Sequence, residues 1–354
     1  MSNALSPVRW FHEFGRPPRI LGLDVARALA ILGMVGAHIG ETGSVVWGDP
    51  RTWAALVNGR SSILFALLAG ISIALMTGRS SIPARESIPD IRLRLVGRGA
   101  VIFVIGLTLE MLNTPIAVIL TLYGLLYVAV IPFLRWTPGR LLAGASVLAL
   151  FGPPLLALVS EVMRGPTGSG IDFVLYGSYP ITVWMVFILA GMAIGRMQIQ
   201  DTRSAWLMLG VGVVVSIVGY ALGGLGAQSG MSDGAASAVF AVAPHSGGTA
   251  EILGSGGFAL AVIAVCLLLS RPLRWAALPL GALGSMPLTA YSAHVLSIVL
   301  LVGPGGFLSS NSFWAATTLF LLVASTAWSM FFGRGPLERL VGKGATAMAA
   351  IPRQ

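Results

Sequence analysis

Four side chains capable of ionic or acid–base chemistry fall within the first long apolar segment: Asp24, Arg27, His38 and Glu41. At about 100° per residue in a helix, Arg27 and His38 differ by only about 20° in direction. Asp24 and Glu41 fall within roughly 60° of that direction. Ionisable groups inside a membrane are costly and are therefore functional candidates. We expect these four groups to form one polar stripe that faces the interior of a helical bundle.

The stripe has two ends, because Arg27 and His38 are about 16 Å apart along a helix that rises ~1.5 Å per residue. At the cytoplasmic end, Asp24 and Arg27 could bind an anionic cytoplasmic ligand, since arginine binds phosphate well. The alternative is an interfacial ion pair that caps the helix and fixes the topology. At the outer end, His38 could act as a general base or as an acyl-carrying nucleophile oriented by Glu41. The alternative is a buried histidine bonded to a neighbouring helix.

Two further charged residues are expected near the outer surface. Arg60 would lie about 10 Å below that surface if its helix begins near Trp53. Glu110, at the outer end of the next helix, is a plausible partner for Arg60. The pair could clamp a substrate, or it could be purely structural.

Two polar segments follow later in the chain. Pro244 to Glu251 enters a helix from outside, so that His245 and Glu251 could close a polar pocket; the alternative is a helix N-cap with Glu251 in the first turn. Tyr291 and His294 lie three positions apart in a later apolar segment. Each needs a hydrogen-bonding partner in a membrane, and core packing alone is the alternative.

The elements that must hold these groups are apolar helices. The sequence is 56% hydrophobic and 10% charged, whereas soluble domains have about 25% charged residues. Apolar runs of nearly 20 residues, long enough for a ~30 Å hydrocarbon core, recur along the chain. We expect an all-α polytopic membrane protein with about ten transmembrane helices at 21–40, 54–77, 99–113, 116–134, 141–162, 180–195, 204–224, 250–270, 280–302 and 313–332.

The connections alternate in charge. With this helix count, 19 of the 22 basic residues fall on one side, and the other side keeps Arg51, Arg60 and Arg164. Because positive residues stay cytoplasmic, both ends of the chain are expected in the cytoplasm. This topology explains the net charge of +9 better than nucleic-acid binding does. We expect a cytoplasmic segment at 1–20, one membrane domain at 21–333 and a cytoplasmic tail at 334–354.

The remaining composition restricts the chemistry. The single cysteine, Cys266, allows neither an intramolecular disulfide nor a multi-cysteine zinc site. No Walker motif is present, and no dinucleotide fingerprint follows a strand. We therefore expect neither a metal nor a bound cofactor.

The segment Leu21 to Ala30, with an arginine three residues after Asp24, resembles the opening of the transmembrane acyltransferase superfamily. The similarity continues at Arg60 to Gly70, Asn113 to Pro132 and beyond. The remaining matching segments are His245 to Gly257, Pro287 to His294 and Gly335 to Glu338. Two branches resemble the chain most: heparan-α-glucosaminide N-acetyltransferase-like proteins and YeiB-like bacterial membrane proteins.

This resemblance implies transfer of an acyl group from a cytoplasmic thioester, usually acetyl-CoA, to a hydroxyl or amine. It implies a membrane-embedded catalytic histidine, which His38 matches in the broader superfamily. In the heparan-type branch the catalytic histidine lies in the loop before the second helix, where this chain has Asp49 and no histidine. The donor would bind near Asp24, Arg27, Arg94 and Arg98. The acceptor side would include Arg60, Glu110, His245, Glu251, Tyr291 and His294.

The resulting hypothesis is a multi-pass acyltransferase of a bacterial plasma (inner) membrane, with acyl-CoA as co-substrate. Its partners would be membrane lipids and a small-molecule or lipid-linked acceptor, without nucleic acid, and a homo-oligomer is compatible with the sequence. A transporter or flippase of a small polar or lipid-linked compound is the alternative, because the same stripe could line a pathway. A structural membrane subunit is a third reading.

Overall fold

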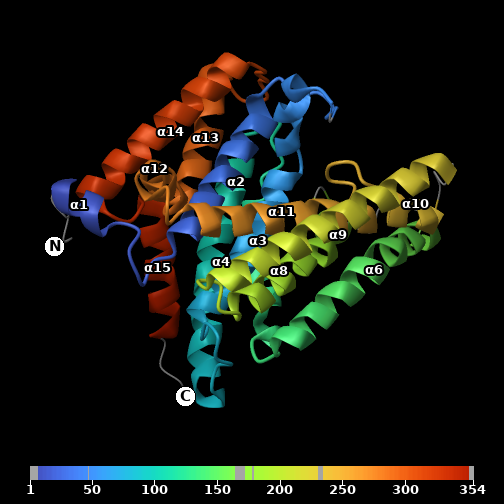
Figure 1. Ribbon diagram of the computed structural model, residues 1–354, viewed down its shortest axis with the longest axis horizontal. Helices are drawn as coiled ribbons and strands as arrows, with labels where there is room; N and C mark the ends of the chain where they lie inside the picture. The colour runs from blue at the N-terminus through green and yellow to red at the C-terminus, as the bar shows by residue number, and fades with distance from the viewer. Residues whose placement is uncertain (1–6, 47, 164–171, 178, 230–233, 351–354) are drawn as a thin grey trace. The chain divides into compact units, whose positions relative to one another are not determined.

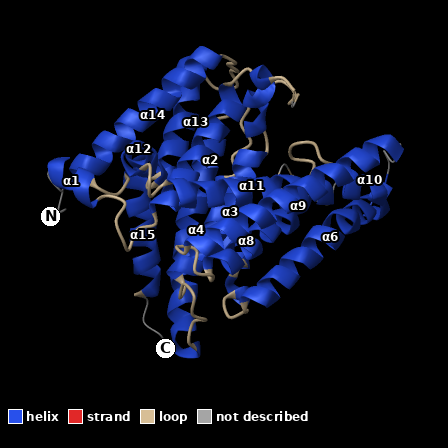
Figure 2. Cartoon of the chain, in the orientation of Figure 1, coloured by secondary structure: helices blue, strands red, loops and turns tan. Residues whose placement is uncertain are grey.

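The computed structural model describes residues 7–46, 48–163, 172–177, 179–229 and 234–350. Figure 2 shows that the described part of the chain consists of helices and connecting loops, without strands. Helices make up 77% of the structure. The all-α fold class is therefore confirmed. Two of the basic residues on which the topology prediction rests, Arg164 and Arg353, lie outside the described residues.

The helices follow the apolar segments of the sequence and are labelled in Figure 1. The first half of the chain contains α1 (Pro7–Glu13), α2 (Leu21–Ile39), η1 (Pro50–Val57), α3 (Arg60–Met76), η2 (Arg85–Ser87), α4 (Ile88–Glu110), α5 (Leu120–Ala129), η3 (Ile131–Phe133) and α6 (Pro138–Met163). The second half contains η4 (Asp172–Tyr176), α8 (Ile181–Gly195), α9 (Thr202–Ser229), α10 (Gly234–Phe240), α11 (Thr249–Leu269), α12 (Arg274–Gly284), α13 (Pro287–Val302), α14 (Asn311–Phe332) and α15 (Pro336–Ala349).

Five of the described helices are long and apolar enough to cross a membrane: α2, α6, α9, α11 and α14. Two bent pairs raise this number to seven if each pair is one span: η1 with α3 bends by 46°, and α12 with α13 bends by 69°. The chain is thus a polytopic membrane protein. The count of ten spans and the cytoplasmic location of both ends stay predictions.

The other three predicted spans coincide with helices of different lengths. The helices α5 and α8 have ten and 15 residues, or about 15 and 22 Å, which is shorter than a ~30 Å hydrocarbon core. The helix α4 begins at Ile88 rather than at the predicted residue 99. Its first turns carry charged residues, which lower the hydropathy without preventing a helix, because arginine is a good helix former.

The chain forms two compact units. Unit 1 contains Met1–Ser62, Leu93–Gly124 and Val265–Gln354, and unit 2 contains Ile63–Arg92 and Leu125–Ala264. The predicted domain boundaries at residues 20 and 333 stay predictions.

Unit 1 is built around α2, which packs against α12, α13 and α14 (Figure 1). Small residues allow this close packing. A Cβ atom at Gly284 of α12 would collide with the backbone oxygen of Asp24, and one at Gly36 would enter the ring of Trp314. The indole N–H of Trp314 donates to the carbonyl of Leu32 over 3.2 Å. These contacts determine where α12 and α14 pack along α2.

In unit 2, α6 packs against α8 and α10, and α9 also packs against α10. Gly191 of α8 reaches the backbone of α3, where an added Cβ would meet the carbonyl of Leu67. The buried Arg196 at the end of α8 donates to the carbonyls of Leu134 and Trp136. Burial lowers the pKa of Arg196 below the usual value for arginine. Arg196 therefore stabilises the connection before α6 rather than serving as a free surface charge.

The predicted C-terminal tail contains a packed helix. Val341 and Ala345 of α15 are buried, and α15 contacts α13. An added Cβ at Gly97 of α4 would meet the carbonyl of Gly344, so α15 also crosses α4 closely. The C-terminal helix is therefore part of unit 1.

Candidate functional site

The end of the stripe that is predicted to be cytoplasmic is an ionic cluster around Asp24. This carboxylate is 5% exposed. It accepts a hydrogen bond from Arg19 over 3.0 Å and another from Arg27, three residues further along α2. Two guanidinium groups thus compensate one buried carboxylate, as buried charges require. The predicted pairing of Asp24 with Arg27 is present, and Arg19 is a partner that the helical spacing did not indicate.

The end of the stripe that is predicted to face outward contains a pair of histidines. His38 Nδ1, near the end of α2, lies 3.2 Å from His294 Nε2 on α13. The ring planes differ by only 8°, with centroids 5.4 Å apart. One ring must donate and the other must accept, because a neutral imidazole has one N–H and one lone pair. The structure therefore brings together two residues that the sequence analysis placed in different roles.

Tyr291 belongs to the same cluster. Its ring lies 6.3 Å from the ring of His38 at an angle of 74°. Tyr291 and His294 are 2% and 1% exposed. His38 is half-buried. Two helices thus enclose an imidazole pair and a phenol within a largely apolar unit.

Glu41 does not orient His38, contrary to our expectation. Its carboxylate accepts a hydrogen bond from the side-chain Nδ2 of Asn311 over 3.3 Å, and its backbone N–H donates to the side-chain Oδ1 of Asn311 over 3.0 Å. The reason is local: α2 ends at Ile39, and Gly40 is extended, with ψ 152°. Helical spacing therefore does not apply to Glu41, which joins the beginning of α14 to the end of α2.

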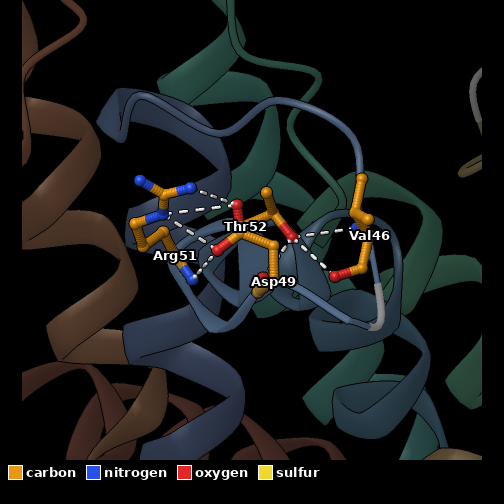
Figure 3. A network of polar contacts seen from close by, with 4 residues as sticks. All are labelled: Val46, Asp49, Arg51 and Thr52. Atoms are coloured by element: carbon orange, nitrogen blue, oxygen red, sulfur yellow. Dashed lines mark hydrogen bonds and ion pairs between the residues drawn. The ribbon is translucent and has the colours of Figure 1, made fainter.

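The loop after α2 is held together by Asp49 and Thr52 (Figure 3). Asp49 accepts hydrogen bonds from the Arg51 Nε and Nη2 atoms, each over 2.9 Å, and from the Arg51 backbone N–H over 3.1 Å. These bonds, chiefly those from the side chain, hold the pKa of the Asp49 carboxyl below its usual value. The Thr52 hydroxyl accepts from the Val46 N–H and donates to the Asp49 carbonyl. Asp49 therefore caps η1 as an ionised carboxylate, which makes it a poor proton acceptor.

Arg60 and Glu110 remain a predicted pair. Glu110 is exposed at the end of α4, and its carboxylate accepts a hydrogen bond from the Thr121 hydroxyl over 2.7 Å. Arg60 is half-buried at the first residue of α3. Glu110 thus connects α4 to α5, which is a structural contact.

Arg94 and Arg98 lie four residues apart on α4, so their side chains share one face of the helix. Arg94 is exposed and Arg98 is half-buried. Both are close in sequence to Gly97, where α4 crosses α15. The predicted phosphate-binding arginines therefore flank a helix crossing in unit 1.

His245 and Glu251 lie in unit 2, where Glu251 organises the loop before α11. Its carboxylate accepts hydrogen bonds from the backbone N–H groups of His245 (2.7 Å) and Gly247 (2.8 Å), and from the Ser246 hydroxyl (3.0 Å). These bonds hold His245 at a φ of 63°, a conformation that non-glycine residues rarely adopt. Glu251 therefore holds the loop that precedes α11 from the first turn of that helix, and its place on the acceptor side stays a prediction.

The ring of His245 contacts an aromatic group. It packs edge-on against Tyr179 with centroids 5.5 Å apart, and Tyr179 packs similarly against Trp184 at 5.2 Å. The His245 residue is exposed, yet the protein atoms around it partly desolvate the ring and lower its pKa. Burial raises the pKa of Tyr179 to about 12. A small pocket at this place is lined by His245, Glu251, Trp184 and Phe187 together with neighbouring apolar side chains.

Glu338 is a residue that the sequence analysis did not place in the site. Its carboxylate accepts hydrogen bonds from the backbone N–H groups of Leu288 (2.8 Å) and Thr289 (3.1 Å) and from the Thr289 hydroxyl (2.5 Å). These donors belong to the first turn of α13, the helix that carries Tyr291 and His294. A short motif, Gly335 to Glu338, was the only signal in the sequence.

Among the described residues, no group of three or more histidine, cysteine, aspartate or glutamate side chains could hold a metal ion. The polar groups of unit 1 instead comprise an arginine-rich end, an imidazole pair and a phenol. This set can bind an anion and can donate or accept protons at a carbonyl group.

Comparison with known proteins assigns the family. No curated protein matches the chain. Residues 19–221, more than half of the 354 residues, match the family described as heparan-alpha-glucosaminide N-acetyltransferase, catalytic. The match contains Asp24, Arg27 and His38, and it also contains Arg94 and Arg98 of α4. The chain therefore belongs to the heparan-alpha-glucosaminide N-acetyltransferase catalytic family of membrane acetyltransferases.

Proposed function

We propose that this protein transfers an acetyl group from cytoplasmic acetyl-CoA to a hydroxyl or amine of a sugar or lipid acceptor in the cell envelope. The observation that carries the proposal is the contact between His38 and His294, which is enclosed by α2 and α13 in a chain of an acetyltransferase family. The proposed location is a bacterial plasma membrane with both ends of the chain in the cytoplasm.

The reaction needs a reacting centre that polarises a thioester. The acceptor oxygen or nitrogen attacks the carbonyl carbon, the C–S bond breaks, and the acceptor proton leaves with the CoA sulfur. Imidazole side chains suit this chemistry, because they can exchange a proton or donate a hydrogen bond near neutral pH. His38 is the group that we assign to the reacting carbonyl. Asp49 is the less suitable candidate, because it is bound by Arg51.

The donor is assigned to the arginine-rich end of unit 1. CoA carries phosphate groups, and arginine binds phosphate through bidentate hydrogen bonds. Arg94 and Arg98 are the best candidates, because Arg27 is already bound to Asp24. Along α2, Arg27 and His38 are about 16 Å apart, a length that suits an extended thioester arm.

Binding of the donor can be tested without knowing the acceptor. A ligand at 100 times its dissociation constant stabilises a protein by about 2.7 kcal/mol. We expect acetyl-CoA to raise the unfolding temperature of the full-length protein in detergent, and ATP to do so less. Arg94→Ala combined with Arg98→Ala should reduce the effect, whereas the exposed Arg140→Ala should retain it. Arg27→Ala is the weaker choice, because it also removes a partner of Asp24.

Transfer is tested in membranes that contain the protein, which supply the natural acceptors. After incubation with acetyl-CoA labelled in the acetyl group, we expect label in the lipid or carbohydrate fraction with the native chain and not with His38→Ala. Equal labelling by a folded His38→Ala protein would remove His38 from the reaction. The proposal would be overturned if acetyl-CoA neither stabilised the protein nor labelled any acceptor. Counterflow of a polar compound would then support a transporter.

A further inference from the structure

The Nδ1 atom of His294 has no hydrogen-bond partner among the described residues. His294 is 1% exposed, and its Nε2 atom is already engaged with His38. A charged imidazole at this place would be costly in a membrane interior. We therefore consider both rings neutral, each with one N–H and one lone pair.

Two arrangements of protons satisfy the contact between the rings. In the first, His294 donates from Nε2–H to His38 Nδ1, so that Nδ1 of His294 is an unpaired lone pair. In the second, His38 donates from Nδ1–H to His294 Nε2, so that Nδ1 of His294 carries an N–H group without a partner. Because a neutral imidazole has only one N–H, each arrangement determines which nitrogen of His38 is protonated. In the first arrangement His38 is protonated at Nε2, and in the second it is protonated at Nδ1.

The first arrangement has the lower free energy. A buried N–H group without an acceptor is rare in proteins, whereas an acceptor with an unused lone pair is tolerated more often. Leaving a buried donor unsatisfied costs about 1–3 kcal/mol. The Nε2 atom of His38 therefore carries the proton when Nε2 of His294 donates.

We infer that His294 is a positioning residue that keeps the proton of His38 on Nε2, so that His38 presents an N–H donor to the thioester carbonyl oxygen. The inference rests on the proposed function and replaces our expectation of a base or acyl-carrying nucleophile. During attack, negative charge develops on that oxygen, and a fixed donor stabilises it. His38 keeps its proton throughout, while the acceptor proton leaves with the CoA sulfur.

The proton position can be measured directly by ¹⁵N NMR of the full-length protein with labelled histidine. The sequence has four histidines, so single His→Gln variants assign the signals. We expect His38 Nε2 to resonate as a protonated nitrogen and His38 Nδ1 as an unprotonated one. The reverse assignment would overturn the inference. This result does not depend on acetyl-CoA, so its failure can be distinguished from failure of the proposed function.

Variants of the pair separate positioning from a structural role. His294→Gln keeps a side-chain N–H donor and should retain the Nε2-protonated form of His38. His294→Phe lacks a donor and should yield a mixture of both forms in a protein that still folds. An unchanged ¹⁵N pattern in His294→Phe would show that His294 does not set the proton position.

The labelling experiment tests the role of the donor. Removal of one donor to a developing oxyanion reduces turnover by about 10²–10³-fold, which we expect for His38→Ala. His38→Gln retains an N–H donor but no basic nitrogen, and it should be at least tenfold more active than His38→Ala. Equal loss in both variants, with the native chain active, would contradict the donor role and leave the acetyltransferase proposal intact.

Discussion

The carboxylate of Glu338 in α15 receives the hydroxyl hydrogen bond of Thr289 in α13 over 2.5 Å. It also receives two backbone N–H groups of the same helix end. The first N–H groups of a helix lack partners within the helix, and a negative charge there is favourable. Met286, at the N-cap position of α13, provides no side-chain cap. Glu338 thus supplies the missing cap from another helix.

Glu338→Ala should lower the free energy of unfolding by about 1–2 kcal/mol, the usual effect of losing a helix cap. Its activity should fall by more than stability alone explains, because α13 carries His294. Thermal unfolding and acetyl transfer in the same preparation measure the two effects. Lys343→Ala, at an exposed position of α15, is the control and should change neither value.

Gly284→Ala should destabilise the protein strongly, because the new Cβ would overlap the backbone oxygen of Asp24. Backbone atoms cannot rotate away, so α12 must shift, and overpacking of this kind costs about 1–3 kcal/mol. Gly210→Ala in α9 is the matched control, since nothing lies within 4 Å of its added Cβ. That control should be neutral or slightly stabilising. Equal unfolding temperatures for both variants would contradict the close approach of α12 to α2.

Arg27→Ala should cost about 1.5–3 kcal/mol, the value of a hydrogen bond to a charged group. Asp24 would then be a buried carboxylate that keeps its hydrogen bond from Arg19. The double variant Asp24→Asn and Arg27→Ala should be more stable than Arg27→Ala alone, because the uncompensated charge is gone. Chemical denaturation of the three proteins measures this difference. No recovery in the double variant would argue against charge compensation at α2.

The free energy of unfolding should depend on pH, because His245 binds a proton more readily in the unfolded state than in the folded state. Desolvation lowers the pKa of His245 in the folded protein, whereas the unfolded value is about 6.5. Above that value both states are neutral and His245 has no effect. As the pH falls below about 6.5, the unfolded state binds the proton first, so stability decreases until the folded pKa is reached. Thermal unfolding between pH 7.5 and about 5 should show this decrease, and His245→Gln should reduce it.

The helices were largely predictable, because crossing a membrane requires long apolar runs. The beginning of α4 was not, because hydropathy reports the preference for lipid and not for a helix. Ile88 to Arg98 is helical despite its charges, and arginine favours helices. Likewise, the bend between α12 and α13 depends on how both pack, which local composition does not describe.

The site was predictable in its residue types and only partly in its contacts. Asp24 and Arg27 share one helix, so their spacing determined their pairing. His38 and His294 are separated by 256 positions, and their contact depends on the packing of α13 against α2. Helical spacing predicted that Glu41 lies beside His38. The helix ends at Ile39, however, and the extended backbone at Gly40 brings Glu41 to Asn311 instead.

Cys266 is buried and is the chain's only cysteine, and its backbone lies against Gly22 of α2. The native protein should thus be nearly silent towards water-soluble maleimides. A cysteine introduced at Arg51 or at Arg85 would provide the only accessible thiol. Labelling of intact cells would then report which side of the membrane each loop faces, without replacement of the native Cys266.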